Sequence, residues 1–250
     1  MIKKNYYIAS CSFGKDSIAT LLIALENNEP INEVIFCEVM FSETISGEIP
    51  EHINFINNIA IPYFEAKGLK VTKLRAKKNY IDSFFHLNKK RNKLQGFPLA
   101  KKCKIKSELK IAPIKSYITK LKKIYNVIEY IGITADEPQR FSVLNANKIS
   151  LLKKYGITQK QSREISEKKG LLSPVYKYTT RQGCWFCPNA SIKEMARIKK
   201  NYANYWDALA NLSKVNNTIS SYFKYNLTFD EVEDQINRYL YFKEKEIFLF

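Results

Sequence analysis

Short apolar segments alternate with helical patterns over the first half of the chain, and this alternation limits the available folds more than any other feature. The apolar segments that read as buried strands are residues 6–10, 34–41, 68–74 and 127–133. The helical patterns between them cover residues 18–25, 50–65 and 107–125. Such an order favours a parallel sheet covered on both faces. We therefore predict an α/β fold with a parallel sheet of about five strands.

The strand signals fade after about Phe141. Three further helical patterns follow, over residues 159–169, 192–212 and 228–246. The pattern predicts an α/β domain over residues 1–145 and a helical region over residues 146–250. No targeting or membrane segment is apparent, because the longest apolar runs are interrupted well before 18 residues.

Positive charge is concentrated in one quarter of the sequence. The chain of 250 residues carries 41 Lys and Arg against 24 Asp and Glu, a formal net charge of +17. Residues 67–125 hold 19 of these bases and only two acids, Asp82 and Glu108, so the rest of the chain sums to zero. A local basic surface attracts nucleotides, polyphosphates or a nucleic-acid backbone. The competing interpretation is a pair of solvated lysine-rich helices.

The turn after the first predicted strand has the composition of a phosphate-binding loop. Glycine lets the backbone approach an anion, the lysine supplies a positive charge, and the following helix supplies free N–H groups and its dipole. The Walker A pattern is absent, because Asp16 follows Lys15. An ordinary capped helix is the alternative. The predicted binding residues are Ser12, Phe13, Gly14, Lys15, Asp16 and Ser17.

This loop resembles the S-x-G-K-D-S PP-loop of the ATP pyrophosphatases, and later segments narrow the resemblance to the PAPS reductase-like proteins. The stretch from Cys103 to Ile114 resembles their C-T-x-x-L-K-I-x-P-I motif, and residues 132–140 resemble G-I-R-A-D-E-x-x-R. Residues 171–176 and 183–188 resemble L-x-S-P-x-Y and G-C-x-x-C-P. The chain departs from the family at Phe13, where many members have glycine, and at Thr134, where arginine is frequent.

The resemblance implies an adenine nucleotide alpha-hydrolase-like fold and cleavage of ATP between the α and β phosphates. Loops after parallel strands converge at one sheet edge, so Asp136 and Arg140 are expected near the PP-loop. There Asp136 would hold Mg²⁺ or a ribose hydroxyl, and Arg140 would meet a phosphate. Residues 48, 51 and 52 (Glu48, Glu51 and His52) either lie near the nucleotide or cap a surface helix. The predicted catalytic residues are Lys15, Asp16, Asp136 and Arg140.

The cysteines carry the second prediction. Cys184 and Cys187 have the C-x-x-C spacing of metal ligands, and Cys103 precedes them by 81 residues. Iron–sulfur sulfonucleotide reductases and some tRNA thiolating PP-loop enzymes have similar arrangements, which implies a [4Fe-4S] cluster with three protein ligands and one open iron. A structural Zn²⁺ site or free thiols are the alternatives. Cys11 and Cys37 are expected to be packing residues, although Cys37 could complete a metal site.

Three functions fit the sequence. The first is an ATP-dependent adenylating enzyme of sulfur transfer, with a nucleic acid bound through residues 67–125 and a sulfur donor or thioredoxin-like protein as partner. The second is a sulfonucleotide reductase acting on PAPS or its analogue, although no cysteine follows Cys187 to serve as the usual C-terminal nucleophile. The third is a nucleotide- or nucleic-acid-binding protein without turnover. A cytoplasmic location is expected from the unpaired cysteine count.

Overall fold

The computed structural model describes residues 3–98, 103–180 and 182–247. The chain divides into two compact units, each assembled from separate stretches. Unit 1 comprises Met1–Glu38, Ile49–Arg75 and Lys110–Gln182, and unit 2 comprises Val39–Glu48, Ala76–Leu109 and Gly183–Phe250. The domain boundary predicted near residue 145 lies within the third stretch of unit 1. The predicted division into residues 1–145 and 146–250 stays a prediction.

Unit 1 contains a five-stranded sheet in the order β3-β2-β1-β6-β7, in which all neighbouring strands are parallel. Its strands are β1 (Asn5–Ser10), β2 (Glu33–Glu38), β3 (Lys70–Arg75), β6 (Asn126–Ile131) and β7 (Lys148–Ile149). The predicted α/β class, parallel sheet and strand number are therefore confirmed. The strand expected over 34–41 ends at Glu38, and β7 has only two residues.

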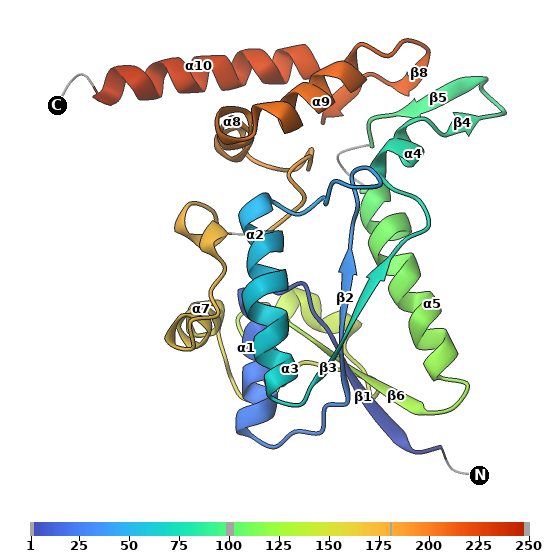
Figure 1. Ribbon diagram of the computed structural model, residues 1–250, viewed down its shortest axis with the longest axis vertical. Coiled ribbons are helices and arrows are strands. Elements are labelled where there is room, and N and C mark those ends of the chain that lie inside the picture. The colour runs from blue at the N-terminus through green and yellow to red at the C-terminus, as the bar shows by residue number, and fades with distance from the viewer. Residues whose placement is uncertain (1–2, 99–102, 181, 248–250) are drawn as a thin grey trace. The chain divides into compact units, whose positions relative to one another are not determined.

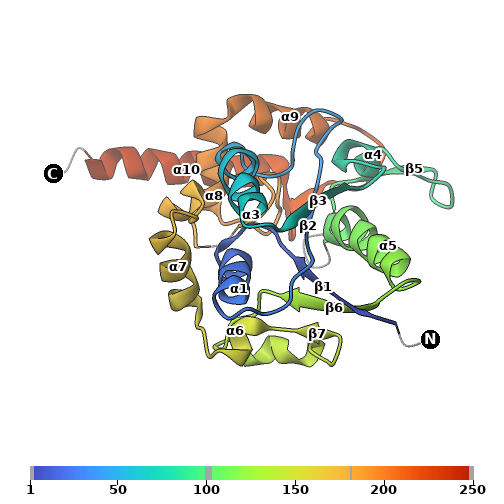
Figure 2. The same cartoon turned by 60° about the horizontal axis from the view of Figure 1, so that its bottom comes forward.

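Side chains alternate across the sheet and build a core on each face. Ala9, Val34 and Phe36 point to the face covered by α1 (Lys15–Glu26) and by the segment from α2 (Pro50–Phe55) to α3 (Ile61–Ala66). Their neighbours Ile8 and Ile35 point to the face covered by α5 (Ala112–Leu121). Figures 1 and 2 show α5 on one side of the sheet, with α1 and α3 on the other. Helices thus cover both faces, as predicted.

Proline explains two interruptions of the expected helices. The pattern over 50–65 is helical throughout, but a π-helical turn (Ile56–Ala60) separates α2 from α3, and Pro62 lies in the first turn of α3. Proline lacks an N–H, so it is tolerated only where no intrahelical bond is required. Pro113 occupies the same position in α5, after a second π-helical turn (Lys106–Ile111).

Two helices of unit 1 follow β7 along the chain. They are α6 (Leu151–Lys154) and α7 (Gln159–Lys168), and α7 begins with a capping box formed by Thr158 and Gln161. A 3-10 turn (Pro174–Lys177) comes next along the chain. Both α6 and α7 pack against α1, so this helix is held from several directions. Residues 12–17, which connect β1 to α1, are called the PP-loop below after the motif that they resemble.

Unit 2 combines short strands with helices around an aromatic core. Its helices are α4 (Tyr80–Phe84), α8 (Ile192–Asn201), α9 (Ala203–Ser213) and α10 (Phe229–Ile247). Its strands are β4 (Leu87–Asn88), β5 (Lys93–Gly96), β8 (Thr218–Ser220), β9 (Tyr222–Lys224) and β10 (Leu227–Thr228). The helical C-terminal part was predicted, whereas these five strands were not. In the part of the chain that the structure describes, no helix has the length and apolarity needed to cross a membrane.

Candidate functional site

The PP-loop joins the end of β1 to the start of α1 through one residue in the left-handed region. Phe13 has φ 54°, a conformation that a bulky L-residue rarely adopts. Its side chain is fully buried and packs against the rings of Phe36 and Phe64, at centroid distances of 5.5 and 6.4 Å. Packing of this ring therefore holds the loop in a turn at the position where the PAPS reductase-like proteins often have glycine.

Gly14 lies beneath two side chains that belong to the last residues of unit 1 along the chain. A Cβ atom at Gly14 would lie 2.4 Å from Gln182 Oε1 and 2.9 Å from the Tyr176 hydroxyl. The backbone N–H of Lys15 donates to the Tyr176 hydroxyl at 3.0 Å. The first turn of α1 thus already binds an oxygen atom, which is what a phosphate would supply at a helix N-terminus. A side chain at residue 14 would displace the amide of Gln182 and the hydroxyl of Tyr176 from these positions.

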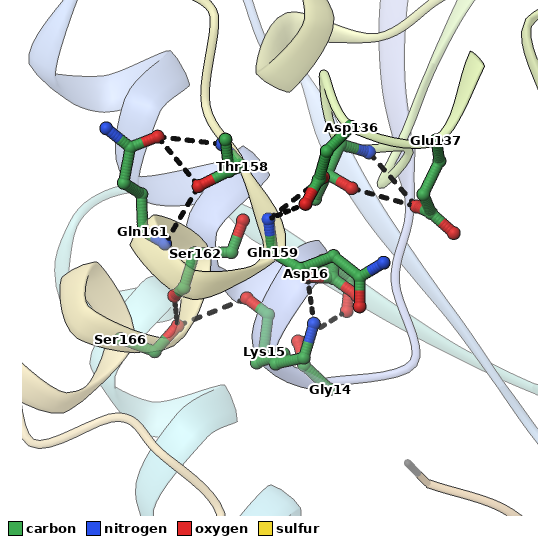
Figure 3. A network of polar contacts seen from close by, with 12 residues as sticks. Gly14, Lys15, Asp16, Asp136, Glu137, Thr158, Gln159, Gln161, Ser162 and Ser166 are labelled. Atoms are coloured by element: carbon green, nitrogen blue, oxygen red, sulfur yellow. Dashed lines mark hydrogen bonds and ion pairs between the residues drawn. The ribbon is translucent and has the colours of Figure 1, made fainter. Parts of the chain in front are cut away.

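Helix α7 positions the backbone around these covering residues. The Ser166 hydroxyl donates to the carbonyl oxygen of Lys15 at 3.1 Å, and Arg163 donates to the carbonyl oxygen of Tyr176 at 3.2 Å. One helix therefore fixes both the start of α1 and the segment that carries Tyr176. Figure 3 shows Ser166 of α7 beside Lys15 of α1.

His52 connects the PP-loop to the segment around Ser173. Its ring is fully buried, with Nδ1 2.8 Å from the Ser173 hydroxyl and Nε2 3.2 Å from the carbonyl oxygen of Ser12. A carbonyl oxygen can only accept, so Nε2 carries the proton and Nδ1 accepts from Ser173. Burial, with a smaller effect of Lys110, lowers the pKa of His52 to about 3. The neutral imidazole therefore holds the Ser12 carbonyl oxygen in place.

This buried imidazole predicts a specific loss of stability in acid. The pKa of His52 lies below that of an unfolded histidine, so between pH 6.5 and 3 only the unfolded chain binds the proton. The stability that His52 contributes is complete above about pH 6.5 and is lost as the pH falls through this range. Comparison of wild type with His52→Gln by urea unfolding isolates this effect, because the carboxylates titrate in both proteins.

The difference in free energy of unfolding between wild type and His52→Gln is expected to shrink by about 2–3 kcal/mol between pH 7 and pH 4.5. His52→Gln retains an amide N–H that can donate toward Ser12, and therefore tests the titration more than the packing. A difference that stays constant with pH would contradict a neutral, desolvated His52.

Charged side chains gather around the start of α1. Lys15 Nζ lies 2.6 Å from Asp16 Oδ1, and the Lys15 side chain is only 11% exposed. Burial raises the pKa of Asp16, while the ammonium of Lys15 opposes this effect. Glu137 and Arg140 also act electrostatically on Asp16. The loops that follow β1 and β6 therefore converge, as the sheet topology requires for neighbouring parallel strands.

Asp136, in the loop after β6, also belongs to this group and contacts the first residue of α7. Its carboxylate accepts from the backbone N–H of Gln159 at 3.1 Å, as Figure 3 shows. The Thr134 hydroxyl, with the N–H of Gln159 and the charge of Lys15, lowers the pKa of Asp136. Arg140 pairs instead with Glu137 at 2.8 Å and is half exposed. Glu137 also accepts from the Thr134 hydroxyl at 3.0 Å.

The two cysteines of unit 1 are buried, and the glutamates near the β2–α2 connection belong to different units. Burial raises the pKa of the Cys11 thiol to about 11, and its sulfur accepts from the N–H of Phe13 at 3.3 Å. Cys37 is buried within β2. Glu51 accepts from the Tyr178 hydroxyl at 3.2 Å, while Glu48 belongs to unit 2. These thiols have the packing environment predicted for them.

The three predicted ligand cysteines all belong to unit 2. Cys103, Cys184 and Cys187 are reduced and partly exposed. The N–H of Cys187 donates to the carbonyl oxygen of Cys184 at 3.0 Å, which closes the C-x-x-C turn. A backbone bridge between Glu48 and Cys184 attaches this turn to residues 46–48. Within residues 3–98, 103–180 and 182–247, no group of three or more His, Cys, Asp and Glu is placed to hold a metal ion.

Tyr80 lies next to these thiols. Burial first, and then the charges of Cys103, Cys184 and Cys187, raise the pKa of Tyr80 far above its ordinary value. Its ring packs against Phe186, at a centroid distance of 4.3 Å. Its hydroxyl is buried and has no hydrogen-bond partner among the described residues. An unpaired buried hydroxyl is costly, so a polar ligand beside the thiols would satisfy it.

Comparisons with known proteins leave the family open. No family model matches the chain. The chain is 26% identical over 227 residues to "Uncharacterized protein MJ0973" of Methanocaldococcus jannaschii, a match that covers 84% of this chain and 48% of that protein. It therefore spans about half the length of the curated relative that it matches. The PAPS reductase-like resemblance remains a prediction.

Among solved structures, the chain is similar to the U34-tRNA thiolase NcsA from Methanococcus maripaludis, a structure that contains a [4Fe-4S] cluster. The TM-score is 0.45 at 13% sequence identity, and the match covers 93% of this chain and 80% of that chain. At these values the similarity gives no information about the reaction of the present chain.

Proposed function

We propose that the chain binds an adenine nucleotide at the PP-loop and cleaves ATP between the α and β phosphates to adenylate an acceptor. The observation that carries this proposal is the loop itself, with Gly14 beneath the Tyr176 hydroxyl and the N–H of Lys15 bound to that oxygen. The motifs that resemble the PAPS reductase-like proteins support the same reaction. Because the chain spans about half of its relative, the activity of a longer protein is also a proposal.

The residues of the loop have distinct parts in this reaction. Ser12, Phe13, Gly14 and Ser17 shape the cradle for the pyrophosphate, and Lys15 stabilises the charge that develops on it. Mg²⁺ is commonly held by one or two carboxylates together with substrate phosphates, and it neutralises phosphate charge when bound. Asp16 and Asp136 are suited to this task. Arg140 would contact phosphate after release from Glu137, 2.8 Å away.

The chemistry of the first step is a displacement at phosphorus. An oxygen of the acceptor forms a bond to the α-phosphorus, and the bond to the bridging α–β oxygen breaks, so pyrophosphate leaves with the electron pair. In the sulfur-transfer step, a hydrosulfide equivalent from a donor attacks the acceptor carbon. The C–O bond breaks, AMP leaves with the electron pair, and the sulfur proton passes to solvent. Both steps balance without an oxidant.

We further propose that the acceptor is a nucleic acid, because residues 67–125 carry the whole net charge of the chain. The test of the proposed function is incubation with ATP labelled at either the α or the γ phosphate, with and without RNA or DNA. Pyrophosphate is the expected product, with the α label on the adenylated acceptor until a sulfide donor is added and AMP is released. ADP and orthophosphate would contradict cleavage between the α and β phosphates, and sulfite release from PAPS would favour a sulfonucleotide reductase.

Cys103, Cys184 and Cys187 are proposed to bind a [4Fe-4S] cluster, with Zn²⁺ as the alternative. Thiolates are suitable ligands for both, and the unpaired Tyr80 hydroxyl beside them is compatible with a bound polar group. Among the described residues, no group of three His, Cys, Asp or Glu side chains is placed to hold a metal ion. No step of the proposed reaction is assigned to this group.

Protein purified without oxygen is expected to be brown and to contain iron and sulfide, with three thiols protected from alkylation. Cys184→Ser should abolish the colour and the bound iron, while Cys37→Ser serves as the matched control because Cys37 lies in the other unit. Colourless protein containing zinc would assign the cysteines to a structural site. Protein without metal, with three reactive thiols, would contradict both.

A further inference from the structure

A tight hairpin in unit 2 presents four uncompensated positive charges at its tip. Strands β4 and β5 pair antiparallel, with Leu87 opposite Leu94 and Asn88 opposite Lys93, and Figure 1 shows the turn between them. The tip bases are exposed, and none of them forms an ion pair with another described residue. We call this set the hairpin tip: Lys89, Lys90, Arg91 and Lys93.

The neighbouring acids do not compensate the hairpin tip. The stretch Ala76–Leu109 contains only two acids. Asp82 forms the capping box of α4 with Asn79, and Glu108 pairs with Lys104 at 3.8 Å. Both carboxylates therefore have local partners, and the charge of the tip is available to an external anion.

The base of the hairpin is rigid. A Cβ atom at Gly96 would lie 2.4 Å from the carbonyl oxygen of Ser220, so glycine permits β5 to pair closely with β8. The next residue, Phe97, is buried against Phe84 and Phe223, at centroid distances of 5.2 and 5.1 Å. A well-packed base limits the ordering of backbone that binding would require.

An exposed aromatic ring precedes the hairpin. Phe85 is 43% exposed and Leu87 is 48% exposed, although both lie beside a well-packed aromatic core. Basic side chains with an accessible aromatic ring are the combination that binds unpaired nucleotides, because the bases stack on the ring and the phosphates meet the cations. A solvated, charged edge that prevents strand pairing would not require an exposed ring.

The hairpin base is also adjacent to the cysteine group. Lys104, which follows Cys103, donates to the side chain of Gln95 on β5 at 3.0 Å. A small pocket lies at this position, and its lining includes Tyr80, Gln95 and Lys104. A nucleic acid held along the hairpin would therefore place nucleotides near the thiols that surround Tyr80.

We propose that the hairpin β4–β5 is a docking surface for an unpaired stretch of nucleic acid, with the hairpin tip contacting phosphates and Phe85 stacking on a base. The inference rests on the proposed function for its biological context, but it concerns a surface separate from the PP-loop residues. RNA and single-stranded DNA offer the same phosphates and bases, so the experiment compares them.

The test measures binding of fluorescent single-stranded RNA and DNA of about 15 nucleotides at several salt concentrations. The tip variant carries Lys89→Gln, Lys90→Gln, Arg91→Gln and Lys93→Gln. Loss of four phosphate contacts is expected to reduce the slope of log affinity against log salt by about 3, and to weaken binding at least tenfold at low salt. Phe85→Leu should weaken binding about tenfold without changing the slope. Phe85→Trp keeps an aromatic ring and should bind about as tightly as wild type.

The matched control removes the same number of charges from exposed lysines outside residues 67–125, through Lys168→Gln, Lys193→Gln, Lys200→Gln and Lys214→Gln. An equal loss of affinity and slope in this control would overturn the hairpin as the specific surface. Unchanged oligonucleotide binding by the tip variant would also overturn it.

Binding of Mg-ATP by the tip variant separates this inference from the proposed function. Normal ATP binding with lost oligonucleotide binding supports the hairpin proposal. Oligonucleotide binding by the wild type that depends on the tip, without any ATP cleavage, supports the hairpin while contradicting the proposed reaction. Preference for RNA or for DNA then identifies the class of nucleic acid.

Discussion

Replacement of Lys15 by alanine is expected to reduce pyrophosphate release from ATP by about 10²–10³-fold, the usual effect of removing one group that stabilises developing charge. The Lys15 side chain is largely buried beside Asp16, so its ammonium is held near the first turn of α1 rather than in solvent. Its loss also leaves the Asp16 carboxylate without its cation, at the position where phosphates would approach.

The control for this prediction is Lys160→Ala, because Lys160 is exposed on α7 in the same unit. Lys15→Arg keeps the charge with a different shape and should retain more activity than Lys15→Ala. The measurement is the initial rate of release of labelled pyrophosphate at saturating ATP. Equal rates for wild type and Lys15→Ala would remove Lys15 from the reaction.

The second large effect concerns stability and depends on the backbone of Phe13. Phe13→Ala is expected to lower the free energy of unfolding by about 3–5 kcal/mol, because the ring is fully buried. Phe13→Gly should be less harmful than Phe13→Ala by about 1 kcal/mol, since glycine adopts the left-handed region without the penalty of a Cβ atom. This order reverses the usual ranking of alanine and glycine.

Phe36 provides the matched comparison for Phe13. Its ring is also fully buried and contacts Phe13, but it lies in the ordinary extended strand β2. There Phe36→Gly should be more destabilising than Phe36→Ala by about 0.5–1 kcal/mol. Urea unfolding of the four variants gives both differences. The same ranking at both positions would contradict a strained conformation at Phe13.

The sequence predicted the sheet well because its strands are long enough to show a pattern. Strands β1, β2, β3 and β6 each have six residues, and β1, β2 and β6 are rich in apolar side chains. Strand β7 and the strands of unit 2 have two to four residues, and so short a segment contains no detectable period. Their pairing depends on distant neighbours, as Leu94 with Thr218 illustrates.

The candidate site was predictable where its residues are contiguous. Six neighbouring residues predicted the phosphate-binding loop, which stays a prediction, and the convergence of Asp136 with this loop follows from strand order. The contacts of Tyr176, Gln182 and Ser166 with the loop were not predicted, because they join residues more than 150 positions apart. No sequence pattern indicated that His52 binds a backbone carbonyl oxygen, because His52 has no partner at a characteristic spacing.

The division of the chain into two units limits how its coding sequence can be rearranged. The polypeptide changes unit after Glu38, Glu48, Arg75, Leu109 and Gln182, so neither unit corresponds to one uninterrupted stretch. No single crossover point separates one complete unit from the other, because each unit combines three separate stretches of the chain. One unit of this protein therefore cannot be replaced by that of a relative through a single exchange of coding sequence.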